Sequence, residues 1–89
     1  MARVTFSPEG FRSFTQLPIS VRFQFNTGFS ILEKSGPDVA ILDTHRLSGA
    51  RDLWTLRIGL YRGIYRWRID EAQFIRFGHR ARVYHRLPK

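Results

Sequence analysis

The stretch from Trp54 to Tyr84, WTLRIGLYRGIYRWRIDEAQFIRFGHRARVY, decides the fold because it predicts a β-hairpin with a fixed register. Gly59 and Leu60 are expected to form its two-residue turn, since glycine at the first central position matches type II′ geometry. This turn sets Arg57 directly opposite Arg62. Two facing guanidinium groups repel each other, so folding alone does not favour this pair. The pair therefore indicates a surface that binds a polyanion, and RNA is the favoured polyanion. The same repulsion predicts that Arg62→Ala leaves the fold intact or slightly more stable.

Strand alternation then divides the side chains of the sheet between two faces. The apolar and aromatic face, which we interpret as core, carries Trp54, Leu56, Ile58, Tyr61, Tyr65, Trp67 and Ile69. The cationic face carries Arg51, Thr55, Arg57, Arg62, Arg66 and Arg68, with Leu53 and Ile64 among them. We interpret the cationic face as a phosphate-binding surface. A binding site for an acidic protein segment and a passive solvated face are the alternatives.

The residues before this stretch predict a short edge strand and two helices. The strand covers residues 3–6; the first helix covers residues 8–17, with Ser7 as N-cap and Pro8 at its first position. The second helix runs from about Pro18 to Ser35 and ends at Gly36 and Pro37. Their inner faces are expected to be Phe11, Phe14 and Leu17, and Val21, Phe25, Gly28, Phe29 and Leu32.

Residues 38–50 are interpreted as a connecting segment with room for a short strand. The main strands are expected over residues 51–58, 61–69 and 73–79, with Asp70, Glu71 and Ala72 supplying the second turn. Eighty-nine residues with 43% hydrophobic content suffice for one domain, residues 1–89, with a single core. The expected architecture is an α+β sandwich.

The composition argues against several classes of protein. The chain has no cysteine, and His45, His79 and His85 lack metal-ligand spacing, so we expect no metal centre. No apolar run approaches the roughly 20 residues that a membrane span needs, and the N-terminus lacks the apolar stretch of a secretory signal. The expected compartment is the cytoplasm, and no membrane partner is expected.

The net charge of +8 belongs entirely to the C-terminal half. Through residue 45, four basic residues balance four acidic ones; from residue 46 onward, eleven Lys and Arg face three acids, which gives 11 − 3 = +8. Thirteen of the fifteen basic residues are arginine, whose planar fork binds phosphate through two hydrogen bonds and stacks on bases. Nucleic acid is therefore the favoured partner. A merely basic, solvated surface is the alternative reading of the composition.

The C-terminal residues 78–86 place histidine, tyrosine and arginine side chains close together. His79 or His85 has the chemistry of a general acid or base near neutral pH, and Tyr84 can stack on a base or donate to a phosphate oxygen. An isolated histidine is more often structural or solvated, and His45 is the weakest candidate of the three.

These motifs together resemble the RelE/ParE superfamily of type II toxin–antitoxin toxins. The resemblance rests on the order of Trp54–Gly59 (W-x-L-R-x-G), Tyr61–Tyr65 (Y-R-x-x-Y), an acidic turn at Asp70 and Glu71, and Gly78–Tyr84 (G-H-R-x-x-V-Y), after FSPEG at the first helix. It covers nearly the whole chain. It implies two N-terminal helices on one face of a twisted antiparallel sheet, in the order β-α-α-β-β-β, with the opposite basic face as the working surface.

The resemblance implies an endoribonuclease that cuts messenger RNA in the ribosomal A site without metal or cofactor, using the RNA 2′-hydroxyl as nucleophile. Arg62 matches the arginine that stabilises the transition state, Arg57 a phosphate-holding residue, Arg80 a residue that assists the leaving group, and Tyr84 a residue that orients the nucleotide. The further RNA-binding candidates are Arg51, Arg66, Arg68, Arg82 and Arg86. An antitoxin with an acidic toxin-binding segment is the implied partner.

One position departs from the RelE pattern. Thr55 stands where RelE-like nucleases carry a lysine, and neither threonine nor the permanently protonated Arg57 can act as a general base. Either His79 or His85 is the base, or positioning and charge suffice, or the chain is not an active nuclease. The alternatives are a ParE-like inhibitor of DNA gyrase and a catalytically inactive binding module with the same fold.

Overall fold

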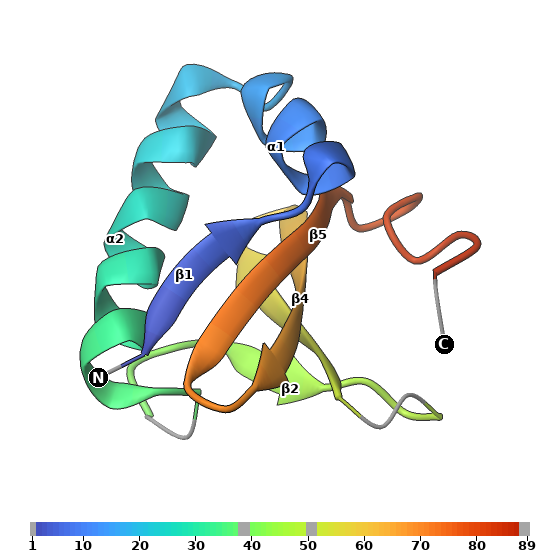
Figure 1. Cartoon of the computed structure of the whole chain (residues 1–89). Helices are drawn as coiled ribbons and strands as arrows, with labels where there is room; N and C mark the ends of the chain where they lie inside the picture. The colour runs from blue at the N-terminus through green and yellow to red at the C-terminus, as the bar shows by residue number, and fades with distance from the viewer. Residues whose placement is uncertain (1, 38–39, 50–51, 88–89) are drawn as a thin grey trace.

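The computed structural model describes residues 2–37, 40–49 and 52–87, in which two helices pack on one face of a five-stranded sheet (Figure 1). The helices are α1 (Pro8–Thr15) and α2 (Ile19–Ser35). The strands are β1 (Arg3–Phe6), β2 (Thr44–Arg46), β3 (Leu53–Ile58), β4 (Tyr61–Arg68) and β5 (Glu71–His79), and their order in the sheet is β1-β5-β4-β3-β2. The predicted α+β class is confirmed. No helix in these residues is long and apolar enough to cross a membrane.

The helix ends follow the predicted signals. The Ser7 hydroxyl accepts a hydrogen bond from the Gly10 N–H at 3.0 Å, and Pro8 occupies the first turn of α1. Gly36 closes α2 with its N–H on the Leu32 carbonyl at 2.9 Å. The backbone of Gly36, with a φ of 73° and a ψ of −173°, is not in the left-handed helical conformation. It lies in an extended region of positive φ that almost only glycine adopts. Helix α1 ends at Thr15, two residues before the predicted end.

The inner face of α2 is as predicted, and so are Phe14 and Leu17 of the predicted first helix, but Phe11 is not. Phe25, Gly28, Phe29 and Leu32 are buried, whereas Phe11 is 61% exposed and only meets the edge of the Phe6 ring. The reason is that α1 contacts the sheet through Gly10 and Ser13, and Phe11 lies about 100° around the helix from Gly10.

The sheet is mixed rather than wholly antiparallel. Strand β1 pairs in parallel with β5, and the other neighbours are antiparallel. The edge position of β1 was predicted, but no feature of the sequence indicates its partner or direction. The connecting segment contains β2, which pairs with β3 and forms the opposite edge.

The hairpin register is confirmed. Ile58 pairs with Tyr61 and Arg57 with Arg62, and Gly59 has a φ of 57° while Leu60 has no positive φ, as a type II′ turn requires. Sequence reasoning placed the second turn wrongly: it consists of Ile69 and Asp70, both with positive φ, and Glu71 already belongs to β5.

Ile69, predicted to join the core, is 96% exposed. The two positive φ values are typical of a type I′ turn, which turns both central residues away from the strand alternation. Arg51, predicted to begin the first main strand, lies outside the described residues; β3 begins at Leu53.

Two apolar clusters lie on opposite faces of the sheet. Between sheet and helices, Tyr65 and Leu56 are buried with Phe residues of α2 and β5, and Trp54 and Trp67 pack against them, as predicted. On the far face, Leu53, Ile64, Ile75 and Val83 form a second cluster, which Leu47 and Leu87 border. The cationic face is therefore partly covered by residues 80–87, which we call the C-terminal segment and which lies away from α2 in Figure 1.

A β-bulge in β5 builds this second cluster. Ile64 pairs with Arg76 and Tyr65 with Phe74, so Ile75 is an extra residue. The bulge lets Ile75 join the far-face cluster while Phe74 and Phe77 remain in the core beneath the helices.

Candidate nucleic-acid interface

Arg57 on β3 and Arg62 on β4 are register partners on the face away from the helices. Ile58 and Tyr61 close the turn as a hydrogen-bonded pair, so Arg57 and Arg62 occupy the next, non-hydrogen-bonded pair, in which side chains come closer. Neither arginine forms an ion pair with any residue that the structure describes. The two cations thus lie together without a neutralising carboxylate in the described part of the chain.

Arg62 is also a structural residue of the hairpin. It is only 8% exposed, and its Nη1 donates to the carbonyls of Gly59 and Tyr61, both at 2.9 Å. These contacts turn its charge toward two carbonyl dipoles and reduce the repulsion from Arg57. The expectation that Arg62→Ala leaves stability unchanged or improved is therefore replaced by an expected modest loss.

Part of the Arg62 guanidinium still reaches solvent. Its Nε and Nη2 make no hydrogen bond within the described residues. In that part of the chain, every fully buried side-chain nitrogen or oxygen has a hydrogen-bond partner. Each of these two nitrogens therefore keeps some contact with solvent, although Arg62 as a whole is only 8% exposed. Guanidinium N–H groups are donors suited to phosphate oxygens, and Arg57, the register partner of Arg62, is exposed.

Thr55 and Tyr84 meet on the same face as the two arginines. Thr55 is 2% exposed and its hydroxyl lies 3.2 Å from the Tyr84 hydroxyl, while Tyr84 is 39% exposed. Thr55 and Arg57 share a strand face at a spacing of two residues. The predicted nucleotide-orienting tyrosine is thus held beside Arg57 by the residue that replaces the expected lysine.

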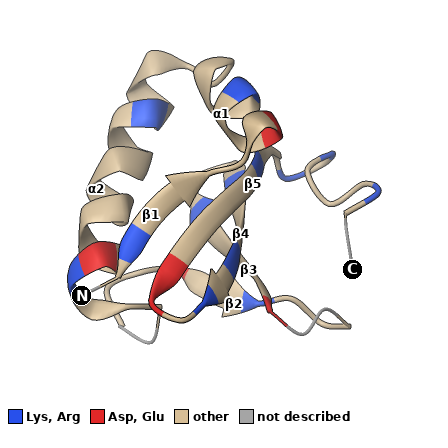
Figure 2. Ribbon diagram, in the orientation of Figure 1, with Lys and Arg blue, Asp and Glu red and all other residues tan. Residues whose placement is uncertain are grey.

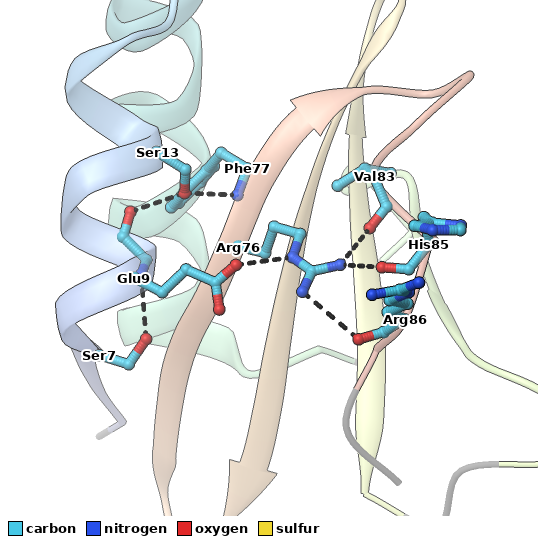
Figure 3. A network of polar contacts seen from close by, with 9 residues as sticks. Ser7, Glu9, Ser13, Arg76, Phe77, Val83, His85 and Arg86 are labelled. Carbon is cyan, nitrogen blue, oxygen red and sulfur yellow. Dashed lines mark hydrogen bonds and ion pairs between the residues drawn. The ribbon is translucent and has the colours of Figure 1, made fainter.

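Arg76 holds the C-terminal segment against the sheet, and sequence reasoning missed it (Figure 3). Its Nε donates to Glu9 Oε2 at 3.0 Å, and its terminal nitrogens donate to the carbonyls of Val83, at 3.2 Å, and of His85 and Arg86. A guanidinium fork has enough donors to join one carboxylate and several carbonyls. Arg76 therefore positions the segment that carries Tyr84. No sequence signal could have found it, because its role depends on the bulge.

The three arginines of the C-terminal segment, Arg80, Arg82 and Arg86, are exposed. The Arg80 N–H donates to the Leu60 carbonyl at 2.8 Å, which places Arg80 beside the hairpin turn and near Arg62. The side chains of Arg82 and Arg86 make no ion pair within the described residues. Figure 2 shows basic positions along β4, β5 and this segment. The segment therefore adds positive charge next to the arginine pair.

The histidines do not join the arginine pair. His79 pairs with Tyr61, on the opposite strand face from Arg62, and its Nδ1 accepts from the Ala81 N–H at 3.1 Å. In a neutral ring this leaves the hydrogen on Nε2, so His79 can donate a hydrogen bond but offers no free lone pair. His85 is exposed and contributes its carbonyl to Arg76. His45 is exposed and bonds to Asp43.

Arg66 and Arg68 are partly neutralised. Asp52 lies 3.5 Å from Arg66 Nη1 and 2.6 Å from Arg68 Nε. The hydrogen bond from Arg68 holds the pKa of Asp52 below its ordinary value of 3.8, and the charges of both arginines act in the same direction. These arginines are thus less available to phosphate than Arg57.

Asp52→Asn is expected to lower stability slightly at neutral pH. Because the pKa of Asp52 is lower in the folded protein, its carboxylate contributes to stability at pH values above the ordinary pKa of 3.8. This contribution is lost as the pH falls through the lower pKa of the folded state. The contribution should not exceed about 1 kcal/mol, since the pair is partly solvated. Urea unfolding of both proteins across acidic pH measures it. A stability difference that grows as pH falls below 3.8 would contradict this assignment.

The described residues contain no group of three or more His, Cys, Asp or Glu side chains that could hold a metal ion. The site consists of guanidinium groups and a tyrosine hydroxyl. Such groups bind anions, donate hydrogen bonds and stabilise developing negative charge.

No protein-family model and no curated protein sequence matches the chain. Solved structures do. A chain of the RelB–RelE antitoxin–toxin complex from Methanococcus jannaschii is 20% identical, with a TM-score of 0.80 over 94% of this chain and 99% of that one. A chain of the RelE–RelB complex from Pyrococcus horikoshii is 26% identical, with a TM-score of 0.73 over 92% and 98%.

The isolated RelE toxin from E. coli is 20% identical, with a TM-score of 0.72 over 89% of this chain and 84% of that one. The likeness extends over both helices and the sheet, because each match covers about nine tenths of the chain. The resemblance noted in the sequence is confirmed at the level of structure: the chain has the fold of the RelE superfamily of toxins.

Proposed function

We propose that this chain is the toxin of a type II toxin–antitoxin pair and that it cleaves messenger RNA in the ribosomal A site. In this reaction the 2′-hydroxyl of the RNA attacks the neighbouring phosphorus, the bond to the 5′ oxygen breaks, and that oxygen takes up a proton. Negative charge gathers on the phosphorane oxygens between these events. Groups that bind the charged phosphorane more strongly than they bind the ground-state phosphate accelerate the step without metal or cofactor.

The observation that carries the proposal is the pairing of Arg57 with Arg62 on the face away from the helices. The accessible Nε and Nη2 of Arg62 are suited to bind the phosphorane, and Arg57 to bind the phosphate before and after reaction. Arg80, beside the hairpin turn, is suited to assist the leaving oxygen. Tyr84, held by Thr55, is suited to orient the nucleotide.

A second candidate is a RelE-fold protein without nuclease activity, including a gyrase-directed toxin. The observation in its favour is that the described residues place no base near the arginine pair: Thr55 is bonded to Tyr84, and His79 offers no lone pair and lies on the other strand face. Under the nuclease proposal, catalysis depends on positioning and charge, with the ribosome or the RNA supplying the proton acceptor.

The proposed protein partner is an antitoxin, which acts with its toxin in the cytoplasm. The support is that similar structures include antitoxin–toxin complexes. The excess of arginine on the C-terminal half favours an antitoxin segment rich in Asp and Glu.

Brief induction of the gene followed by mapping of messenger RNA ends tests the function. A ribosome-dependent nuclease should produce cuts in register with the reading frame on translated messages, and none on untranslated ones. Intact messages together with cleaved or relaxed DNA would favour gyrase. Growth arrest without either lesion would leave the nuclease proposal unsupported and point to a different target.

A further inference from the structure

A hollow of about 480 Å³ lies where β5 ends, between α1 and the C-terminal segment. Strand β1 pairs only with Glu71 to Phe74, so beyond Phe74 the edge of β5 faces α1 instead of another strand. Ser13 bridges this gap by accepting from the Phe77 N–H at 2.9 Å. The shortness of β1 therefore creates the hollow.

The walls of the hollow are rich in hydrogen-bond donors. They include Gln16, His79 and Arg82, and no Asp or Glu of the described residues lines them. Because Nδ1 of His79 accepts from the Ala81 N–H, its Nε2 carries the proton of a neutral ring and is a donor. Arg82 is exposed and forms no ion pair within the described chain. A cation and neutral donors without a carboxylate suit an anion.

Arg76 also borders the hollow, but its charge is directed elsewhere. Its guanidinium is occupied by Glu9 and by the carbonyls of the C-terminal segment. Arg76 therefore supports the wall that carries Arg82, and Arg82 supplies the available positive charge.

The hollow is next to the arginine pair in the sheet. Gly78 pairs with Arg62 and His79 with Tyr61, and both Gly78 and Tyr61 line the hollow. Neighbouring strands lie roughly 4.8 Å apart. A line from Arg57 through Arg62 crosses β5 at Gly78 on the same face and reaches the hollow at the edge of the sheet, where Tyr61 and His79 line it from the other face. A polyanion that continues in this direction would enter the hollow by bending over the edge of β5.

We infer that the hollow binds a backbone phosphate of single-stranded RNA adjacent to the phosphate at the arginine pair. This inference rests on the proposed function, since it extends the same RNA beyond Arg62. The rings of Tyr61 and His79 meet edge to face, with their centroids 5.8 Å apart. They provide an apolar wall for the ribose attached to this phosphate.

Gln16→Glu tests the inference, because it places a carboxylate in the hollow at an exposed helix end. Gln24→Glu, on the exposed surface of α2, makes the same change of charge away from the hollow. The probe is a short single-stranded RNA whose 2′-hydroxyls are methylated to prevent cleavage. Gln16→Glu should weaken binding about fivefold relative to Gln24→Glu, as expected for disturbing one phosphate contact among several. Equal affinity of the two variants would overturn the inference.

The salt dependence of binding gives a second readout. Arg82→Gln should reduce the slope of log Kd against log salt by about 0.7, the value for one phosphate on a single strand. Lys34→Gln, at the far end of α2, should leave the slope unchanged. An unchanged slope in Arg82→Gln would contradict the assignment of Arg82.

Inorganic phosphate separates this inference from the proposed function. Titration of the wild-type protein should shift the NMR signals of the His79 ring and the Gln16 amide saturably, and Gln16→Glu should remove the shift at His79. If the short RNA does not bind at all, the assignment of the hollow to RNA fails, while the mapping of messenger RNA ends decides the proposed function separately. This titration still decides whether the hollow is an anion site. Saturable phosphate binding with equal RNA affinity in the two glutamate variants would assign the hollow to another anion, such as an acidic peptide side chain.

Discussion

Arg62→Ala is expected to lower the rate of messenger RNA cleavage on translating ribosomes at least about a hundredfold and to abolish growth arrest. The reason is that, in the proposed mechanism, the Nε and Nη2 of Arg62 donate to the phosphorane, and loss of one such preorganised donor typically costs that much. The measurement is single-turnover cleavage of a programmed ribosome by purified protein, which removes effects of expression level.

The same substitution should cost about 1–2 kcal/mol of stability, because it deletes the hydrogen bonds from a charged donor to the Gly59 and Tyr61 carbonyls near solvent. For a domain of this size, that is a fall in melting temperature of roughly 4–16 °C. Activity must therefore be measured well below the melting temperature of the variant.

Arg57→Ala is the matched control for this experiment. It removes an equal charge from the register partner, but Arg57 is exposed and makes no hydrogen bond to the hairpin turn through its side chain in the described structure. It should weaken RNA binding with almost no change in melting temperature. Full cleavage by folded Arg62→Ala would remove Arg62 from the mechanism, and growth arrest without cleavage would favour the gyrase-directed alternative.

The hairpin and its two faces could be predicted because their determinants are local. Gly59 followed by Leu60 determines the turn, the turn determines that Arg57 pairs with Arg62, and alternation determines the faces. The same holds for the Ser7 cap and for Gly36 after α2. Each of these inferences uses residues within a few positions of one another.

Apart from the position of the second turn, the main errors arose where the structure depends on residues far apart in the sequence. The parallel partner of β1, the bulge at Ile75 and the packing of Val83 on the far face involve contacts between distant segments. Arg76 acquires its role only after the bulge directs it toward the C-terminal segment. The open cationic face inferred from alternation is therefore narrower in the structure, and it is concentrated around Arg57 and Arg62.

Gly10 shows how a local rule can predict the wrong direction for the effect of a substitution on stability. As a helix residue it looks weak, because alanine is favoured over glycine by about 1 kcal/mol in a helix interior. In the structure, however, a Cβ on Gly10 would lie 2.0 Å from the Phe74 carbonyl oxygen. This oxygen is part of the backbone of β5, and it already accepts a hydrogen bond from the Ser7 N–H at 3.0 Å. Glycine is needed there for the close approach of α1 to the sheet.

Gly10→Ala is accordingly expected to destabilise the protein by about 3 kcal/mol or more, which corresponds to a fall in melting temperature of at least roughly 12 °C. Relief of the clash must move α1 away from β5, which breaks the Ser7 contact and the bond from Phe77 N–H to Ser13. It also moves Glu9, the carboxylate partner of Arg76, so tryptic cleavage after Arg80 and Arg82 should accelerate. Thermal unfolding and limited proteolysis measure the two effects.

Gly28→Ala is the matched control, because it makes the same substitution within a helix that packs on the sheet. There the added methyl would meet Leu56 Cδ2 at 3.2 Å, the tip of a flexible side chain that can move by a few tenths of an ångström. The gain in helix propensity and the small rearrangement should nearly cancel, so its stability should stay within about 1 kcal/mol of the wild type. If Gly10→Ala were instead as stable as Gly28→Ala, α1 would not rest on the Phe74 carbonyl, and the support that it gives to Arg76 and the C-terminal segment would need another origin.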